Sequence, residues 1–202
     1  MMLELRKYVL SQDPLVYIID DFFTESEAQQ LINAAREQMQ RAKVSSDAEG
    51  VYSKARTNQL AWISHKHSMV VTDLGSRIAQ QVGLPLRNAE SFQVIHYDQS
   101  QEYRSHFDAY DMNTERGKRC TARGGQRLFT ALGYINSPAS GGSTYFSKLD
   151  INVAPKPGRL LVFENVVRGT TDVHPKSLHA GMPVVAGEKW AFNLWFHERE
   201  FK

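Results

Sequence analysis

The chain has 202 residues, of which 42% are hydrophobic and 23% are charged, a composition typical of a soluble globular protein. Its formal net charge is only +2, and no stripe of Lys and Arg alternates with aromatic residues, so nucleic acid is not an expected partner. The length fits one domain, and we expect residues 1–202 to form a single unit.

The single cysteine, Cys120, has no partner for an intramolecular disulfide, which favours a reducing compartment. The first 15 residues carry charges where a signal peptide needs an apolar run, and no segment approaches the ~20 apolar residues that span a bilayer. We therefore expect a cytoplasmic protein with no membrane partner, which is compatible with a bacterial or viral source.

Two amphipathic helices are expected in the N-terminal part. Thr24 and Glu27 have the spacing of a capping box, and apolar residues follow them at helical intervals. A second helix is predicted within residues 68–85, where apolar side chains recur every four residues until a glycine and a proline end the pattern. We expect a helical part over about residues 1–88.

From about residue 89 onward, short extended runs separated by Gly, Pro and Asn predict antiparallel strands. The runs are SFQVIHY, RLFTALGYI, STYFS, RLLVFEN and KWAFNLWFHE. Short strands without intervening helices indicate a sandwich or barrel. The expected fold class is α+β, with a double-stranded β-helix (jelly-roll) core in about residues 89–202 and the N-terminal helices packed on one of its sheets.

The last predicted strand has two different faces, because side chains alternate along a strand. One face is apolar and carries Trp190, Phe192, Leu194 and Phe196. The other face is polar and aromatic and carries Lys189, Ala191, Asn193, Trp195 and His197. The second face borders either a pocket or solvent, and the strand alone does not distinguish the two.

The stretch YRSHFDAYD contains a candidate metal-binding pair. If this stretch is extended, His106 and Asp108 project on the same side, as two ligands of one ion must. Two histidines and one carboxylate bind iron in non-haem Fe(II) oxygenases and leave coordination positions open. Without a second histidine, a surface loop or a hydrogen-bonded pair explains the two residues better than a metal site does.

The second half of the chain resembles the prolyl 4-hydroxylase branch of the iron(II)/2-oxoglutarate-dependent dioxygenases. The resemblance covers about the last 110 residues and depends on SHFD, GGQR, GGST, PKPGRLLVFEN, SLHAG, GEKW and WFHER. It implies that His106, Asp108 and His179 are the iron ligands. It also implies that Lys189, ten residues after His179, binds 2-oxoglutarate, whose carboxylate needs a charged partner in a partly dry pocket.

The same resemblance implies roles for seven further residues. Those expected to contact 2-oxoglutarate are Tyr97, Thr144 and Asn193. Those expected to line the channel for the target proline are Tyr103, Arg127, Trp195 and His197. Ordinary structural roles remain open for all seven, such as a turn threonine, a strand-edge arginine or a core tryptophan.

The chain departs from the family at three positions: His96 stands where arginine is common, Ser143 where glutamate is common, and Asn193 where threonine is common. The retained Asp108 favours hydroxylation, because related halogenases replace this carboxylate with a small residue.

The resemblance implies an Fe(II)- and 2-oxoglutarate-dependent dioxygenase that hydroxylates a peptidyl proline. It implies consumption of O2, decarboxylation of 2-oxoglutarate to succinate, and L-ascorbate to keep the iron reduced. The alternatives are the same iron chemistry on a free amino acid, a lysyl residue or a small metabolite, and a non-catalytic jelly-roll binding module.

Two other histidine motifs compete as metal sites. His65 and His67 have the spacing of two ligands, but no third ligand follows at a recognisable spacing, so we expect a solvated loop. His174 is close to His179 but precedes a proline in a loop-like stretch, which favours a connection. The charged segment 109–126 is expected to be a loop, either a surface connection or a lid over a bound peptide. Its Arg and Lys residues disfavour basic peptides.

Overall fold

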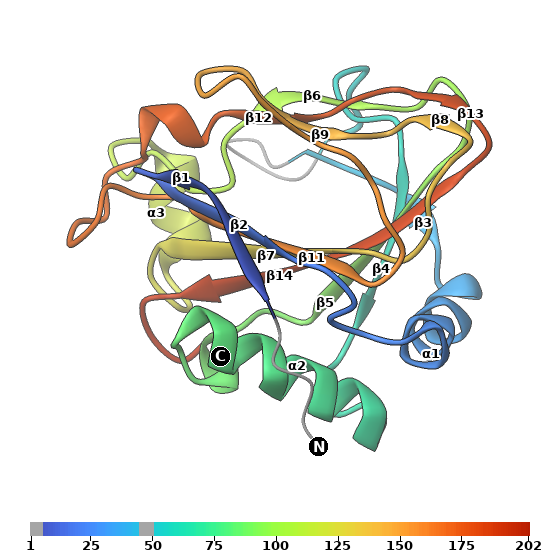
Figure 1. Ribbon diagram of the computed structural model, residues 1–202. Coiled ribbons are helices and arrows are strands. Elements are labelled where there is room, and N and C mark those ends of the chain that lie inside the picture. Colours follow the sequence, from blue (N-terminus) through green and yellow to red (C-terminus); the bar gives the residue numbers. More distant parts are fainter. Residues whose placement is uncertain (1–5, 45–50) are drawn as a thin grey trace.

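The computed structural model describes residues 6–44 and 51–202. An eight-stranded antiparallel sheet faces a smaller four-stranded sheet, and two helices cover the outer face of the larger one (Figure 1). This arrangement is the jelly roll with helices on one sheet that the sequence predicts.

Strand pairing defines two sheets and a separate ribbon. The large sheet consists, from edge to edge, of β1 (Lys7–Gln12), β2 (Leu15–Ile19), β11 (Arg159–Glu164), β7 (Arg127–Tyr134), β14 (Lys189–His197), β5 (Phe92–Tyr97), β4 (Gln59–Ile63) and β3 (Gln40–Arg41). The small sheet consists of β10 (Ile151–Val153), β9 (Thr144–Phe146), β12 (His179–Gly181) and β6 (Tyr103–His106). The ribbon pairs β13 (Val184–Ala186) with β8 (Ser140–Gly141).

The helices are α1 (Glu25–Arg36), α2 (Met69–Val82) and α3 (Glu115–Thr121), with 3-10 turns η1 (Leu86–Asn88) and η2 (Pro175–Ser177). Both predicted helices are confirmed. Thr24 and Glu27 form the expected capping box at the start of α1, and Gly83 ends α2 in the left-handed conformation at φ +78°. Within the described residues, no helix combines the length and the apolar character that crossing a bilayer would require.

The hydrophobic core has two parts, one on each side of the large sheet. The apolar face of β14, from Trp190 to Phe196, packs with α1 and α2 in the outer part. Ala191 on the opposite face belongs to the inner part, between the two sheets. Phe192 lies against Gly133 of the neighbouring strand, where a side chain would collide with its ring. The two faces of β14 therefore differ as predicted.

The N-terminal part contains more than helices. Strands β1 to β4 all precede residue 89 and extend the large sheet at both edges, so the description of about residues 1–88 as helical was incomplete. These strands have at most six residues, which is too short for a clear alternating pattern. The five predicted strands are confirmed as β5, β7, β9, β11 and β14.

One predicted loop is partly helical. Within residues 109–126, the segment Glu115–Thr121 forms α3, and the Thr114 hydroxyl accepts a hydrogen bond from the Gly117 N–H at 3.0 Å. This helix has few apolar residues, and for that reason helical periodicity did not reveal it.

Candidate active site

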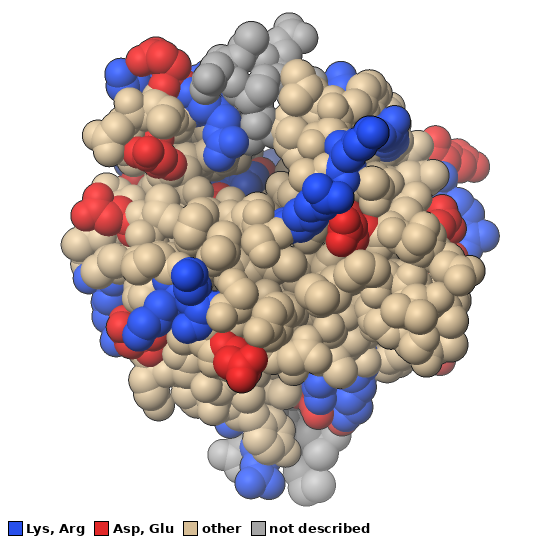
Figure 2. Space-filling model, turned by 90° about the horizontal axis from the view of Figure 1, so that it is seen from above, with Lys and Arg blue, Asp and Glu red and all other residues tan. Residues whose placement is uncertain are grey.

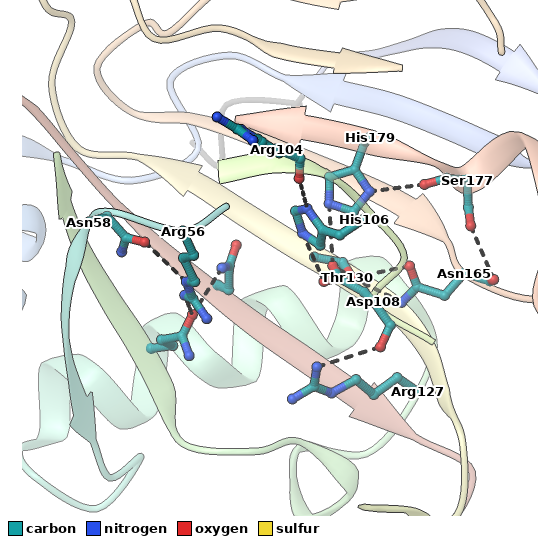
Figure 3. A network of polar contacts seen from close by, with 12 residues as sticks. Arg56, Asn58, Arg104, His106, Asp108, Arg127, Thr130, Asn165, Ser177 and His179 are labelled. Atoms are coloured by element: carbon teal, nitrogen blue, oxygen red, sulfur yellow. Dashed lines mark hydrogen bonds and ion pairs between the residues drawn. The ribbon is translucent and has the colours of Figure 1, made fainter. Parts of the chain in front are cut away.

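The three predicted metal ligands meet between the two sheets. His106 ends β6, His179 begins β12, and the two residues are direct partners across these antiparallel strands. Asp108 follows β6, and one donor atom from each residue lies within 4.8 Å of the other two. The Asp108 carboxylate oxygens lie 3.6 Å from His106 Nε2 and 3.7 Å from His179 Nε2 (Figure 3).

Backbone carbonyl groups orient both imidazoles. The Nδ1 atom of His106 lies 2.8 Å from the Arg104 carbonyl oxygen, and that of His179 lies 2.9 Å from the Ser177 carbonyl oxygen. A carbonyl can only accept, so each Nδ1 carries the proton and each Nε2 presents its lone pair to the shared centre. Tyr103 stacks on the His106 ring with centroids 3.6 Å apart and further limits its rotation.

Asp108 is held by two residues that were not predicted from the sequence. The Thr130 hydroxyl donates a hydrogen bond of 2.7 Å to Asp108 Oδ2, and the Asn165 amide donates one of 2.9 Å to the Thr130 oxygen (Figure 3). Thr130 is a polar residue inside the apolar run RLFTALGYI, and this contrast was the available signal. Asn165 follows β11 and gave no such signal.

The protonation states of Asp108 and His179 suit a metal ion. Burial would raise the pKa of Asp108, but the imidazoles of His179 and His106 and the Arg127 guanidinium hold it well below its usual range. Burial, together with His106, lowers the pKa of His179 to about 4. One carboxylate and two neutral imidazoles are the donor set that Fe(II) takes in non-haem oxygenases, so the residues fit that ion.

Lys189 is buried at the start of β14, beside Tyr97 and Tyr134. Its side chain is only 2% exposed, burial lowers its pKa to about 7, and no carboxylate of the described residues pairs with it. The ammonium lies 5.3 Å from the ring centres of both Tyr97 and Tyr134. Tyr134 donates a hydrogen bond of 2.7 Å to the Thr144 hydroxyl. A buried cation without a counter-ion, among hydroxyl groups, fits the carboxylate of a bound acid.

The structure thus brings Lys189, Tyr97 and Thr144 together, as the predicted 2-oxoglutarate site requires, and adds Tyr134 to them. Asn193 is placed differently. It lies on the same face of β14 as Lys189, but its amide is 3.4 Å from the Gln93 side-chain oxygen, and no described contact joins it to the lysine. Its predicted contact with 2-oxoglutarate gains no support from this position.

An open cleft of about 1000 Å³ leads to the metal ligands. Tyr103, Arg127 and Trp195, which were predicted to line the substrate channel, all line this cleft. The Arg127 guanidinium lies over the Trp195 ring at 3.9 Å from its centre. The indole N–H of Trp195 is buried and has no hydrogen-bond partner in the described part of the chain.

His197 does not line the cleft, so its prediction as a substrate-binding residue is not supported. A register shift between Phe196 and His197 breaks the regular alternation of β14. The His197 ring consequently lies against the Gly125 carbonyl oxygen at 2.8 Å and against Glu90 at 2.8 Å.

Glu90 connects His197 with Arg127, and no sequence pattern had pointed to it. Its side-chain oxygen lies 2.6 Å from Arg127 Nε and 2.8 Å from His197 Nε2. Burial would raise the pKa of Glu90, but Arg127 and His197 lower it to about 2. Burial would lower the pKa of Arg127, but Glu90 and Tyr110 raise it above its usual range. Arg127 therefore lines the cleft as a guanidinium that stays protonated and is held in place by Glu90.

The competing histidines do not join the site. His67 is exposed, but His65 is half-buried and hydrogen-bonded to the Glu90 carbonyl oxygen, so the prediction of a solvated loop was wrong for His65. His174 caps η2 and lies 3.2 Å from Asp13. Among the described residues, neither His65, His67 nor His174 belongs to a cluster that could hold a metal ion.

Comparison with known proteins gives the same picture. Residues 92–197 match the family described as the 2OG-Fe(II) oxygenase superfamily. A protein of Acanthamoeba polyphaga mimivirus, provisionally named a prolyl 4-hydroxylase, is 36% identical over 185 residues, which cover 92% of this chain and 75% of that protein. Prolyl 4-hydroxylase 5 of Arabidopsis thaliana is 32% identical, with 96% of this chain and 72% of that protein covered.

A solved structure agrees as well. The viral collagen prolyl hydroxylase of Paramecium bursaria Chlorella virus-1, in its 2-oxoglutarate complex, superposes with a TM-score of 0.71 at 27% identity, covering 89% of this chain and 94% of that one. Together with the His106, Asp108 and His179 cluster, these matches show that the chain belongs to the prolyl 4-hydroxylase branch of the 2OG-Fe(II) oxygenase superfamily and is an Fe(II)- and 2-oxoglutarate-dependent dioxygenase.

Proposed function

We propose that this dioxygenase hydroxylates a prolyl residue within a peptide or protein, at C4, and that ascorbate keeps its iron reduced between turnovers. The observation that carries the proposal is the position of the metal ligands. His106 and Asp108 line an open cleft of about 1000 Å³, whereas the ammonium of Lys189, which has no carboxylate partner among the described residues, is buried and does not line the cleft. Since 2-oxoglutarate would bind at Lys189, outside the cleft, the cleft remains free for the substrate. The relatives named as prolyl hydroxylases support the choice of proline.

The protein contributes geometry and charge. When bound, iron(II) with 2-oxoglutarate and O2 supplies the oxidation, which turns a C–H bond into C–OH and releases succinate and CO2. His106, His179 and Asp108 would hold the ion, with their orientation fixed by the two carbonyl groups and Thr130. Lys189 would pair with the distal carboxylate of 2-oxoglutarate.

The cleft residues suit an extended peptide. Arg127 provides hydrogen-bond donors to the cleft, and Glu90 holds its guanidinium in place beside the Trp195 ring. Tyr103 lines the cleft and stacks on the His106 ring, so an aromatic side chain borders the place where the target proline would lie. The cleft also extends beyond these residues to β3 and β4, farther than a free amino acid or small metabolite requires.

The test is mass spectrometry of proline-containing peptides incubated with the protein, Fe(II), 2-oxoglutarate and ascorbate, with free proline, free lysine and lysyl peptides as competitors. We expect an increase of about 16 Da on a prolyl residue, the mass of one oxygen atom, matched by an equal amount of succinate. His106→Ala, Asp108→Ala and His179→Ala should abolish both products. Lys189→Ala should chiefly raise the KM for 2-oxoglutarate.

Hydroxylation of the free amino acids alone would contradict the proposed substrate. Absence of O2 consumption with all components present would instead favour a binding module. Loss of turnover on omission of ascorbate, with recovery when it is added back, tests its proposed role.

A further inference from the structure

The charges that line the cleft are unevenly distributed. The lining cations Arg41, Lys43 and Arg56 lie on β3 and on the segments beside β3 and β4, at one edge of the large sheet. The lining carboxylates of the described residues lie elsewhere, on the segments that follow β6 and β11; they are Asp108, Asp111 and Asp172. In the close-up, Arg56 lies on the opposite side of the metal ligands from Asn165 (Figure 3).

The two acidic segments are joined to each other. The Gln126 amide donates hydrogen bonds to the Tyr110 carbonyl oxygen at 2.6 Å and to the Thr171 carbonyl oxygen at 3.1 Å. Asp111 and Asp172 are the next residues along the chain, so both belong to the same end of the cleft.

Two further lining cations, Arg116 and Arg127, also belong to that end, since both lie near the Tyr110 ring, at 5.7 and 5.1 Å from its centre. Arg127 is already paired with Glu90, so it adds no net charge there. The end formed by β3 and β4 therefore carries the excess of positive charge, and this cationic end is defined by Arg41, Lys43 and Arg56.

The cations of the cationic end have no carboxylate partner among the described residues. Arg56 is buried and donates to neutral acceptors, Asn58 Oδ1 at 3.0 Å and Gln93 Oε1 at 2.9 Å. Arg41 and Lys43 are exposed, and each lies 5.2 Å from the centre of the Tyr52 ring. Lys and Arg side chains also lie beside the hollow in the space-filling view (Figure 2). The cationic end can therefore attract an anionic group.

Strand spacing gives the distance from Arg41 and Lys43 to the metal site, whereas Arg56 lies closer to that site, at 4.6 Å from the centre of the Tyr103 ring. Thr130, which holds Asp108, lies on β7, and β3 is four strands farther along the sheet, after β14, β5 and β4. At about 4.8 Å per strand this is roughly 19 Å, which an extended peptide covers in about six residues at ~3.3 Å each.

We propose that the cationic end selects peptides with an acidic side chain roughly four to seven residues from the target proline, on one side of that proline only. This inference names the substrate class of the proposed prolyl hydroxylation and rests on it. The one-sidedness follows from the position of the cations at a single end of the cleft.

The experiment uses a set of peptides with one central proline and a single Glu moved along either flank, each compared with its Gln counterpart. We expect Glu to raise kcat/KM about two- to fivefold per ion pair at roughly four to seven residues on one flank, and not on the other. The advantage should shrink between about 20 mM and 500 mM NaCl, because salt screens exposed charges.

Variants assign the effect to the cationic end. Arg41→Gln combined with Lys43→Gln should lower kcat/KM for the best Glu peptide to the value for its Gln counterpart. Arg36→Gln combined with Lys66→Gln removes the same net charge from exposed residues that do not line the cleft, and should leave the Glu advantage intact.

Binding of fluorescein-labelled peptides to the anaerobic Fe(II) and 2-oxoglutarate complex gives a readout independent of turnover. One-sided Glu preference in binding without hydroxylation would uphold the cationic end and refute the proposed function. Hydroxylation with equal Glu effects on both flanks, or with none, would overturn only the charge selection. Absence of both binding and hydroxylation would refute both.

Discussion

Thr130 shows how much a single hydroxyl group contributes to the iron site. It donates to the buried Asp108 carboxylate at 2.7 Å and accepts from Asn165, so it fixes the carboxylate without ligating the metal itself. Removing such a partner typically lowers metal affinity by roughly 10- to 100-fold.

We therefore expect Thr130→Val to weaken Co(II) binding, followed by the d–d absorption of the Co(II) complex, by about tenfold or more. Thr130→Ser, which keeps the hydroxyl, should restore most of the affinity. Equal binding by the Val and Ser variants would show that the hydrogen bond does not position the ligand.

The proposed pairing of Lys189 with 2-oxoglutarate should make the binding of 2-oxoglutarate depend on pH. Burial lowers its pKa to about 7, whereas the bound carboxylate requires the ammonium form. Below pH 7 the lysine is already protonated, so the Kd for 2-oxoglutarate changes little. Above pH 7 each binding event must take up a proton, and the Kd rises up to about tenfold per pH unit until it reaches the higher pKa of the complex.

This Kd can be measured by calorimetry from about pH 6 to pH 9 with the Co(II) protein. Lys189→Arg is the control, because a guanidinium stays charged throughout this range and should remove the pH dependence whatever its effect on affinity. A wild-type Kd that does not change above pH 7 would contradict the role of Lys189.

At the scale of secondary-structure elements, the Arg127, Glu90 and His197 group joins β7, β14 and the chain entering β5. Glu90 is 7% exposed, and its pKa is lowered to about 2 from a usual 4.5. The carboxylate thus stabilises the fold fully above about pH 4.5, and this contribution disappears as the pH falls towards 2.

We expect Glu90→Gln to lower the free energy of unfolding by about 3 kcal/mol at pH 7, since it leaves a buried guanidinium without its counter-ion. Urea denaturation should show that the difference from wild type is constant between about pH 5 and 8 and decreases below pH 4.5. A constant difference down to pH 3 would show that Glu90 acts through packing and not through its charge.

The elements that could be predicted from the sequence are those whose own residues determine them. The capping box at Thr24 and Glu27 and the two-faced strand Lys189–His197 depend on local patterns, and both are confirmed. Strands β1 to β4 were missed because they are short. β2 and β4 join the sheet by pairing with β11 and β5, which lie farther along the chain. His197 points away from the cleft because the strand register shifts between Phe196 and His197, and no residue pattern in the sequence indicates this shift.

Local sequence patterns likewise predicted only part of the candidate active site. The spacing in SHFD and the positions of His179 and Lys189 led to the candidate site residues, because family resemblance preserves order along the chain, and His106, Asp108 and His179 do form one cluster. Thr130, Tyr134 and Glu90 act through contacts between strands that are far apart in the sequence. Only the folded arrangement reveals which side chains these residues meet.

At the scale of the whole molecule, metal binding should stabilise the fold. The ligands come from β6 and β12 of the small sheet, and Asp108 is tied to β7 of the large sheet through Thr130, so a bound ion links both sheets. A ligand that binds only the native state adds about 2.7 kcal/mol at a concentration of roughly 100 times its Kd. For a chain of this size that corresponds to a Tm increase of roughly 5–10 °C.

We expect Co(II) to raise the Tm by about this amount in differential scanning calorimetry, and 2-oxoglutarate to raise it further when Co(II) is present. Asp108→Ala should lose the Co(II) effect, whereas Arg36→Gln, which changes an exposed residue of α1, should retain it. An equal Tm increase in Asp108→Ala would place the metal elsewhere.

The direct pairing of His106 with His179 also bears on how such enzymes diversify. Because the two ligands face each other across adjacent strands, their separation is set by the backbone hydrogen bonds of the small sheet. The long stretch of chain between them can gain or lose residues in its turns without moving either imidazole. Evolution can therefore remodel the loops around the cleft, and with them the choice of substrate, while the oxidising centre stays unchanged.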